Sequence, residues 1–279
     1  MVQELCASTV GIFDSELFEK IANSSSRIPS EAKREAWIAD TILLLASQLG
    51  ESAVLSGGSA VRNITRVMRA TYDIDFDTNI NSLQQMRQTL KQANQRVQLK
   101  KTNKLGALYE NPERNNVKTF YGERKMLHML RRTDVGIIKV HIMHAPEMPE
   151  MFTNPLRLEL VSIETTDRKV PNARAEHLFF RKCIRANTEK RVEDFLDTYY
   201  ILQSIGASRR RDLIAYAKDK DANATANGLK ILAEDPESYI PQLNARLTYV
   251  ENDRSTGRLK EIAYSISQEL LKVGGEICS

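Results

Sequence analysis

Cysteine is scarce in this chain of 279 residues, and the three that occur, Cys6, Cys183 and Cys278, lie far apart. An odd and scattered set matches neither a disulfide framework nor the paired spacing of a zinc site, and it favours a reducing compartment, which we expect to be the cytoplasm. The chain contains no run of about 18 apolar residues, which argues against a membrane-spanning helix. Its first residues also lack the basic segment of a secretory signal peptide.

The formal net charge is only +4, but the charge is unevenly distributed. Between Arg87 and Arg132, twelve lysines and arginines are offset by three glutamates, so this segment carries +9. Such a segment suits a phosphate-rich partner such as RNA, and Tyr109, Phe120 and Tyr121 within it offer rings for stacking on bases. A solvated helix face and loop is an equally good interpretation of the same composition.

The pattern of residues 1–170 indicates a mixed α/β domain. A helix is expected at 30–49, with Ser30 as its N-cap and Gly50 as its end. Gly57-Gly58 should turn the chain into a second helix at 59–69, and a polar helix should follow at 82–95. Strands are expected at 53–55, 73–77, 96–102, 116–121, 135–143 and 157–164.

After Pro171 the strand patterns disappear, and residues 171–279 read as a helical domain. Helices are expected at 173–187, 190–204, 208–219, 225–233, 238–249 and 257–273. The chain should therefore consist of an α/β domain followed by a helical bundle that packs on it.

The Gly-Gly-Ser segment at 57–59 has the character of a phosphate-binding turn. Gly57 and Gly58 have no side chains, so their backbone N–H groups can approach an anion, and the N-terminus of the following helix favours negative charge. Ser59 can cap that helix or donate to a phosphate oxygen. Most turns of this kind bind no phosphate, so the segment is weak evidence on its own.

Three aspartates alternate directly after this turn. In a strand, Asp73, Asp75 and Asp77 would share one face, with Ile74 and Phe76 buried on the other. Carboxylates that close repel one another unless a cation lies among them, and Mg²⁺ commonly binds one or two carboxylates together with substrate phosphates. The pair Asp73 and Asp75 therefore indicates metal-assisted phosphoryl or nucleotidyl transfer, and Asp77 is expected to be a bystander. The alternative is an exposed strand face with solvated acids.

Together these segments resemble the AbiEii/AbiGii toxin group of the nucleotidyltransferase superfamily. The group carries Gly-Gly-Thr/Ser-Ala-Leu-Arg and Arg-Phe-Ser-x-Asp-Ile-Asp-Phe, and this chain has Gly-Gly-Ser-Ala-Val-Arg at 57–62 and Asp-Ile-Asp-Phe at 73–76. Thirteen residues separate Ser59 from Asp73, which is the spacing of the group. Arg69 occupies the place of the arginine, and Thr71 stands where serine is usual.

The resemblance implies a nucleotidyltransferase-like mixed sheet with flanking helices, followed by a helical bundle. It implies that Asp73 and Asp75 bind Mg²⁺ or Mn²⁺. The residues implied in holding the nucleotide phosphates are Gly57, Gly58, Ser59, Arg69 and Lys182.

A second group of residues lies more than 100 positions further on. Lys182 stands at the edge of the apolar stripe of the helix at 173–187, and Asp194 and Asp197 lie together on the next helix. Taken alone, structural salt bridges with Lys182, Arg185 or Arg191 explain them best. The AbiEii-like proteins, however, carry a late lysine and an Arg-x-x-Asp segment here, which implies that Lys182 binds phosphate and Asp194 is catalytic, with Asp197 a weaker candidate. The resemblance covers about residues 33–205.

One position departs from the family pattern. The strand at 135–143 should carry a third acid, and His141 stands there instead; imidazole suits softer metals than Mg²⁺. Either the alignment is displaced, or the site uses Asp73, Asp75 and another residue, or catalysis is impaired. His141 also reads as an ordinary half-buried strand histidine.

The resemblance implies a Mg²⁺-dependent nucleotidyltransferase that transfers an NMP from an NTP to RNA, such as a tRNA 3′ end, or to a protein hydroxyl. It would be a toxin of a toxin–antitoxin or phage-defence system, restrained by an antitoxin. The alternative is a weakened member that only binds nucleotide or RNA, which His141 favours. A glycosyltransferase with an Asp-x-Asp motif fits less well, because only about 70 residues precede the motif.

Overall fold

The computed structural model describes residues 29–65, 73–100, 108–111, 116–162, 165–246 and 255–279. The chain divides into two compact units. Unit 1 comprises Met1–Ser59, Tyr72–Val117 and Glu123–Ala173, and unit 2 comprises Ala60–Thr71, Lys118–Gly122 and Arg174–Ser279. None of the helices in the described ranges is long and apolar enough to span a bilayer.

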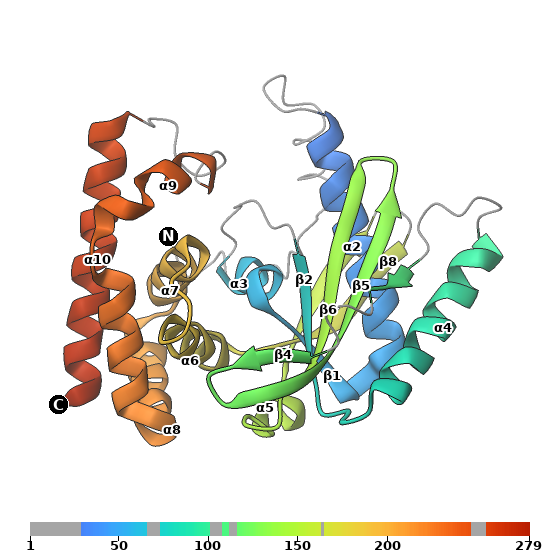
Figure 1. Cartoon of the computed structure of the whole chain (residues 1–279), viewed down its shortest axis with the longest axis horizontal. Coiled ribbons are helices and arrows are strands. Elements are labelled where there is room, and N and C mark those ends of the chain that lie inside the picture. Colours follow the sequence, from blue (N-terminus) through green and yellow to red (C-terminus); the bar gives the residue numbers. More distant parts are fainter. Residues whose placement is uncertain (1–28, 66–72, 101–107, 112–115, 163–164, 247–254) are drawn as a thin grey trace. The chain divides into compact units, whose positions relative to one another are not determined.

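Unit 1 is built on a mixed sheet of eight strands in the order β3-β5-β6-β2-β1-β8-β7, with β4 paired to β5 (Figure 1). The strands are β1 (Ala53–Ser56), β2 (Asp73–Thr78), β3 (Leu108–Glu110), β4 (Asn116–Thr119), β5 (Gly122–Thr133), β6 (Gly136–His144), β7 (Leu156–Ser162) and β8 (Thr165–Asn172). The β2–β6 and β1–β8 pairs are parallel, whereas β1–β2, β3–β5, β5–β6 and β7–β8 are antiparallel. All four residues of β1 are buried, as befits a central strand.

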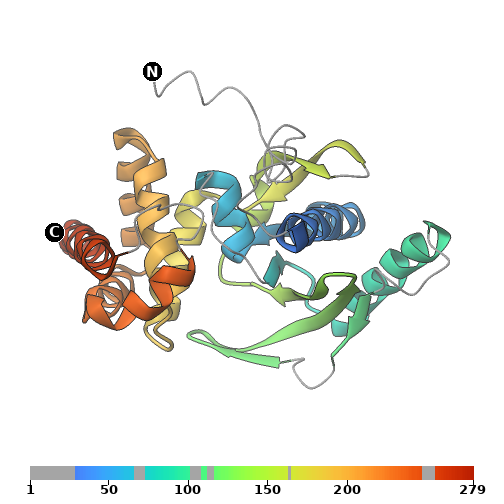
Figure 2. The same ribbon diagram turned by 90° about the horizontal axis from the view of Figure 1, so that it is seen from above.

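The helices α2 (Pro29–Leu49), α4 (Leu83–Lys100) and α5 (Glu150–Thr153) belong to unit 1, whereas α3 (Gly57–Thr65) begins in unit 1 and continues into unit 2 from Ala60. The long helix α2 packs against β1, β7 and β8, and α4 packs against α2 and β3 (Figures 1 and 2). The buried stripe of α2 includes Ile38, Ile42 and Leu45, whose spacing of four and three residues places them on one helical face. After α2, Gly50 adopts a φ of +57° and begins the short 3₁₀ turn η2 (Gly50–Ser52).

Unit 2 is helical, with α6 (Ala175–Ala186), α7 (Val192–Ser204), α8 (Ala207–Ala233), η4 (Pro236–Tyr239), α9 (Ile240–Arg246) and α10 (Thr256–Cys278). Helix α8 packs against both α6 and α10. A Cβ at Gly228 of α8 would lie 1.8 Å from the carbonyl oxygen of Cys183 in α6, so only glycine permits this approach. The expected fold class, an α/β sheet with flanking helices followed by a helical region, is confirmed.

Several finer predictions are wrong. The strand expected at 96–102 continues α4 as far as Lys100, because a segment rich in Gln, Lys and Arg favours a helix. Ser30 lies inside α2, which already begins at Pro29, so it is not the N-cap. The two helices expected at 208–219 and 225–233, by contrast, are present: they meet within α8 at a kink at Asp221, whose backbone is not helical (φ −169°, ψ 89°). The strands β3, β5 and β8 were not expected at all.

A buried arginine joins α2 to the sheet. Arg131 of β5 is 2% exposed, and its guanidinium donates to Asp40 (Nη2–Oδ2 2.7 Å) and to Thr41 Oγ1 (2.6 Å). It also lies 4.9 Å from the ring centroid of Trp37. All three partners are on α2, so this one cation is paired, hydrogen-bonded and stacked, which offsets its desolvation.

We predict that Arg131→Met lowers the free energy of unfolding by about 2 kcal/mol, because Asp40 and Thr41 lose a charged, buried partner. The neighbouring Arg132 is exposed, so Arg132→Met is the matched control and should change stability by less than about 0.5 kcal/mol. Urea unfolding of both variants measures the difference. Equal stability of the two variants would contradict this account.

Candidate active site

The candidate site is a row of side chains that crosses four strands. Ser56 of β1 lies opposite Asp75 of β2, Asp75 lies opposite His141 of β6, and His141 lies opposite His128 of β5. Residues two apart in a strand share a face, so Asp73 lies on the same side of the sheet as this row. On the other face, Ile74 and Phe76 are completely buried, with exposures of 0% and 1%. The expected alternation along β2 is therefore confirmed.

The glycine turn and the aspartate strand meet at Gly57. This residue has a φ of +61°, and a Cβ placed on it would lie 2.0 Å from Oδ2 of Asp75. No other residue fits there without displacing the carboxylate. The buried Ser59 adds a second link, because its Oγ donates to the backbone oxygen of Asp73 at 3.4 Å. The Gly-Gly-Ser and Asp-Ile-Asp segments thus form one local structure.

His141 is the direct partner of Asp75, with its Nδ1 2.9 Å from Oδ1 of the carboxylate. Burial lowers the pKa of His141, but the hydrogen bond and charge of Asp75, helped by Asp73, outweigh it and hold the pKa above its ordinary value. The ring also lies 4.9 Å from that of His128. His141 therefore stands beside the predicted metal pair, where it orients Asp75 through Oδ1.

The aspartate face becomes more buried along β2. The side chain of Asp75 is 33% exposed, whereas Asp77 is 0% exposed and lies opposite Val54 and Met143. An exposed strand face with solvated acids does not describe this arrangement. Asp73 and Asp75 lie at the accessible end of the strand, where a ligand can reach them.

The donor chemistry of this end fits a hard divalent cation. Two half-buried carboxylates are the contribution that proteins typically make to Mg²⁺, with phosphates and water supplying the other oxygens. Within the described ranges, no group of three or more His, Cys, Asp or Glu side chains has the arrangement of a metal site. Two carboxylates leave coordination positions that phosphate oxygens and water can fill, so Asp73 and Asp75 suit a cation that arrives with a phosphate ligand.

The second predicted cluster is assembled within unit 2. Lys182 of α6 is 4% exposed, and its Nζ donates to Asp194 Oδ1 at 3.2 Å and to Asp197 Oδ2 at 2.6 Å. Both carboxylates are on α7 and are 0% exposed. Arg185 also binds Asp194, with Nε 2.7 Å from Oδ2. Arg191 is exposed and pairs with Glu189 instead.

The charges of this cluster balance, with two cations against two carboxylates. Burial raises the pKa of Asp194, but the charges of Arg185 and Lys182 outweigh it and lower the pKa to about 2. The arrangement is that of a structural salt-bridge network between α6 and α7. The phosphate-binding role of Lys182 and the catalytic role of Asp194 remain predictions. Arg69, the other expected phosphate ligand, lies outside the described residues.

The sequence did not predict that two further residues, His128 and Arg185, belong to these clusters. His128 belongs to the β2–β6–β5 row, but β5 was not expected, so nothing placed it opposite His141. From the sequence, Arg185 is only one of several possible salt-bridge partners. Its position three residues after Lys182 puts both cations on one side of α6, and this spacing is the signal that could have identified it.

We predict that Gly57→Ala destabilises the protein by about 3 kcal/mol. A positive φ costs an alanine about 1 kcal/mol, and displacing the Asp75 carboxylate adds about 2 kcal/mol of overpacking. Gly50 is the matched control, because its φ is +57° and a Cβ there meets nothing within 4 Å. Gly50→Ala should lose only the stability that a positive φ costs an alanine. A similar loss of stability in both variants would refute the close approach of Gly57 to Asp75.

The low pKa of Asp194 predicts a pH dependence of stability. Its folded pKa of about 2 lies below the usual 3.8, so the stabilisation is complete above about pH 5 and is lost as the pH falls towards 2. The loss should be about 2 kcal/mol in urea titrations of the wild type. Asp194→Asn should be about 3 kcal/mol less stable than the wild type at neutral pH, and it should lose less stability on acidification. Asp212 is exposed on α8, so Asp212→Asn is the control and should have the stability of the wild type at neutral pH.

Comparisons with known proteins bear on the fold. Neither a family model nor a curated protein sequence matches the chain, so membership of the AbiEii/AbiGii group remains a prediction. Among solved structures, JHP933 from Helicobacter pylori is 16% identical over 87% of this chain and 94% of its own, with a TM-score of 0.46. MenT4, a nucleotidyltransferase toxin from Mycobacterium tuberculosis H37Rv, is 13% identical over 94% of this chain and 90% of its own, with a TM-score of 0.51. At this identity the likeness is one of fold: the chain shares the fold of a nucleotidyltransferase.

Proposed function

We propose that this protein is a metal-dependent nucleotidyltransferase that transfers an NMP from an NTP to a hydroxyl group. The observation that carries the proposal is the approach of Gly57 to Asp75, where a Cβ would lie 2.0 Å from the carboxylate. It brings a turn suited to phosphate against a carboxylate suited to Mg²⁺. Either feature alone is common, but together they can bind both the phosphates of a nucleoside triphosphate and the cation that accompanies them.

Each residue of the turn and strand has a role in this proposal. The backbone N–H groups of Gly57 and Gly58 and the N-terminus of α3 bind phosphate oxygens. Ser59 positions the turn through its bond to the Asp73 backbone. Asp73 and Asp75 hold Mg²⁺ or Mn²⁺, which when bound neutralises phosphate charge and favours the ionised form of a nearby hydroxyl.

The reaction forms a bond between the acceptor oxygen and the α-phosphorus and breaks the bond to the bridging oxygen, so that pyrophosphate leaves. Within the proposal, Arg69 and Lys182 bind the triphosphate, and Asp194 is the acid of unit 2 that is tied to catalysis. The structural alternative for Lys182 and Asp194 is supported by their buried pairing with each other. Nucleotide binding by Lys182→Met, measured after its folding has been checked, distinguishes the two roles.

The acceptor and the biological role extend the proposal. The basic segment at 87–132 favours RNA, such as a tRNA 3′ end, over a protein hydroxyl. The toxin activity named for MenT4 supports a toxin in a toxin–antitoxin or phage-defence system, with an antitoxin as its partner.

A second function has a specific observation in its favour. His141 occupies one carboxylate oxygen of Asp75 and supplies no acid of its own. A protein with this substitution can bind nucleotide or RNA without transferring a nucleotide. Transfer therefore has to be measured separately from binding.

We predict that the protein labels RNA when it is incubated with an α-labelled NTP, Mg²⁺ and total tRNA, each NTP being tested in turn. Asp73→Asn and Asp75→Asn should reduce the rate by about 100-fold or more, because each removes a carboxylate that holds the metal ion against the triphosphate. Glu123 is an exposed acid away from the face that carries Asp73 and Asp75, so Glu123→Gln is the matched control and should keep full activity.

The location of the label identifies the acceptor, since RNA and protein separate on a denaturing gel. Mg²⁺-dependent NTP binding that is lost in Asp75→Asn, without label in any fraction, would support the binding-only alternative. Binding and transfer that persist unchanged in both aspartate variants would refute the site itself.

A further inference from the structure

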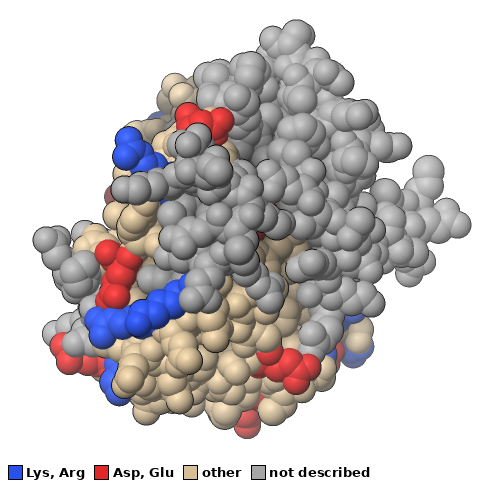
Figure 3. Space-filling view, turned by 90° about the vertical axis from the view of Figure 1, so that its right-hand side faces the viewer, with Lys and Arg blue, Asp and Glu red and all other residues tan. Residues whose placement is uncertain are grey.

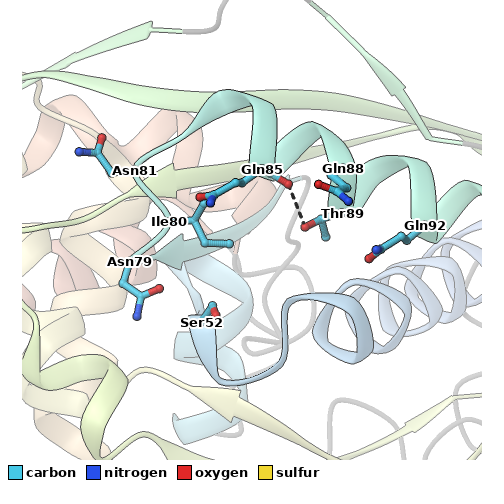
Figure 4. Close-up of a pocket in the computed structure, with 8 residues that line it drawn as sticks. All are labelled: Ser52, Asn79, Ile80, Asn81, Gln85, Gln88, Thr89 and Gln92. Carbon is cyan, nitrogen blue, oxygen red and sulfur yellow. Dashed lines mark hydrogen bonds between the residues drawn. The ribbon is translucent and has the colours of Figure 1, made fainter.

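A polar pocket lies at the opposite end of β2 from Asp73 and Asp75. It has a volume of about 640 Å³ and is formed by the segment after β2, the start of α4 and the end of η2 (Figure 4). Among the residues that the structure describes, five carboxamide side chains line it: Asn79, Asn81, Gln85, Gln88 and Gln92. Since β2 has six residues, the pocket is about 17 Å from the candidate active site along the strand.

The chemistry of the lining restricts the ligand. Ser52, Thr89 and Ile80 are the other described residues of the wall, so no described charged side chain or aromatic ring lines the pocket. Small-molecule sites of this size are mostly apolar, whereas each carboxamide here offers a donor and an acceptor side by side. Such a lining suits a flat, neutral group with its own donors and acceptors, and carboxamides pair with base edges in this way.

The helix that forms one wall is free of acids. The 18 residues of α4 include six glutamines and four lysines or arginines, but no aspartate or glutamate. Gln85, Gln88 and Gln92 recur at spacings of three and four residues, so they follow one helical face towards the pocket (Figure 4). None of their side-chain amides is hydrogen-bonded to another described residue.

Cations border the uncharged pocket. Lys91 is exposed on α4 between Gln88 and Gln92. At the other end, Lys125 Nζ donates to the backbone oxygen and to Oδ1 of Asn81, at 3.1 and 3.2 Å. Figure 3 views the molecule from the side of α4 and shows, among the described residues, an area of uncharged residues with both basic and acidic groups at its edges. A nucleotide chain has the complementary arrangement, because each neutral base lies between charged phosphates that the cations can contact.

We propose that this pocket binds the bases of a single-stranded nucleic acid, with Gln88 and Gln92 reading base edges and Lys91 and Lys125 contacting phosphates. Single strands are favoured because their unstacked bases present free edges, whereas the major groove of duplex RNA is too deep and narrow. The inference extends the proposed function by giving a nucleic-acid acceptor a second contact, but binding here requires no catalysis.

The test is fluorescence anisotropy with a labelled single-stranded RNA of mixed sequence, without NTP and in the presence of a chelator. A double variant, Gln88→Ala with Gln92→Ala, should raise Kd about tenfold, since each base-edge contact is worth at least about 1 kcal/mol. Gln84→Ala is the matched control, because Gln84 is an exposed glutamine of α4 that does not line the pocket. Alanine favours helix at all three positions, so the variants should fold.

A second variant separates base contacts from charge. Lys91→Gln should weaken binding for every sequence and reduce the slope of log Kd against log salt by about one. A DNA strand of the same sequence forms the parallel arm, and loss of affinity in the double variant with either strand supports the proposal. Equal affinities for wild type, double variant and Gln84→Ala would overturn it, and so would equal binding of an uncharged polymer.

The outcome is independent of the transferase proposal. Asp75→Asn should abolish transfer and leave anisotropy unchanged, because Asp75 lies at the other end of β2. A protein without transferase activity that still loses RNA affinity in the double variant would support the pocket while refuting the active site.

Discussion

The approach of Gly57 to Asp75 is the constraint on which the candidate active site depends. Because no side chain fits between the turn and the carboxylate, the end of β1 lies directly against β2. The antiparallel register of β1 and β2 pairs Ser56 with Asp75 beside this contact, and the parallel register of β6 places His141 on the far side of the same carboxylate. Asp75 is thus held from two sides, by backbone and by imidazole, before any ligand binds.

The surroundings of the two acidic clusters determine what each can do. Asp194 is fully buried and matched by two cations, so its charge is already neutralised within the protein. Asp75 pairs with His141 and keeps a third of its side chain exposed, so a ligand can still reach it. Carboxylates that look equivalent in sequence therefore differ in their availability to a ligand, and the difference comes from burial.

Sequence periodicity predicts local features of this chain well and long-range pairings poorly. The alternation of Asp73 to Asp77 and the helical stripe of α2 arise from nearby residues, and both were predicted correctly. Strand β5 was missed because its Arg, Lys and His residues interrupt the apolar pattern; Arg131 is tolerated in the interior only because α2 supplies Asp40 and Thr41. The contact of Gly57 with Asp75 depends on a register between strands, which no local pattern contains.

The same pairings change the meaning of the basic segment at 87–132. Arg87 binds Glu110, Arg124 binds Glu147 and Arg131 binds Asp40, so three of its cations serve the fold. The charge of +9 therefore overstates what a nucleic acid can meet, and the electrostatic attraction rests on fewer exposed lysines and arginines such as Lys91 and Arg132. With fewer phosphate contacts available, the hydrogen-bonding groups of the protein have to supply more of the binding energy. An acid-free helix that presents glutamines rather than further cations is consistent with that balance.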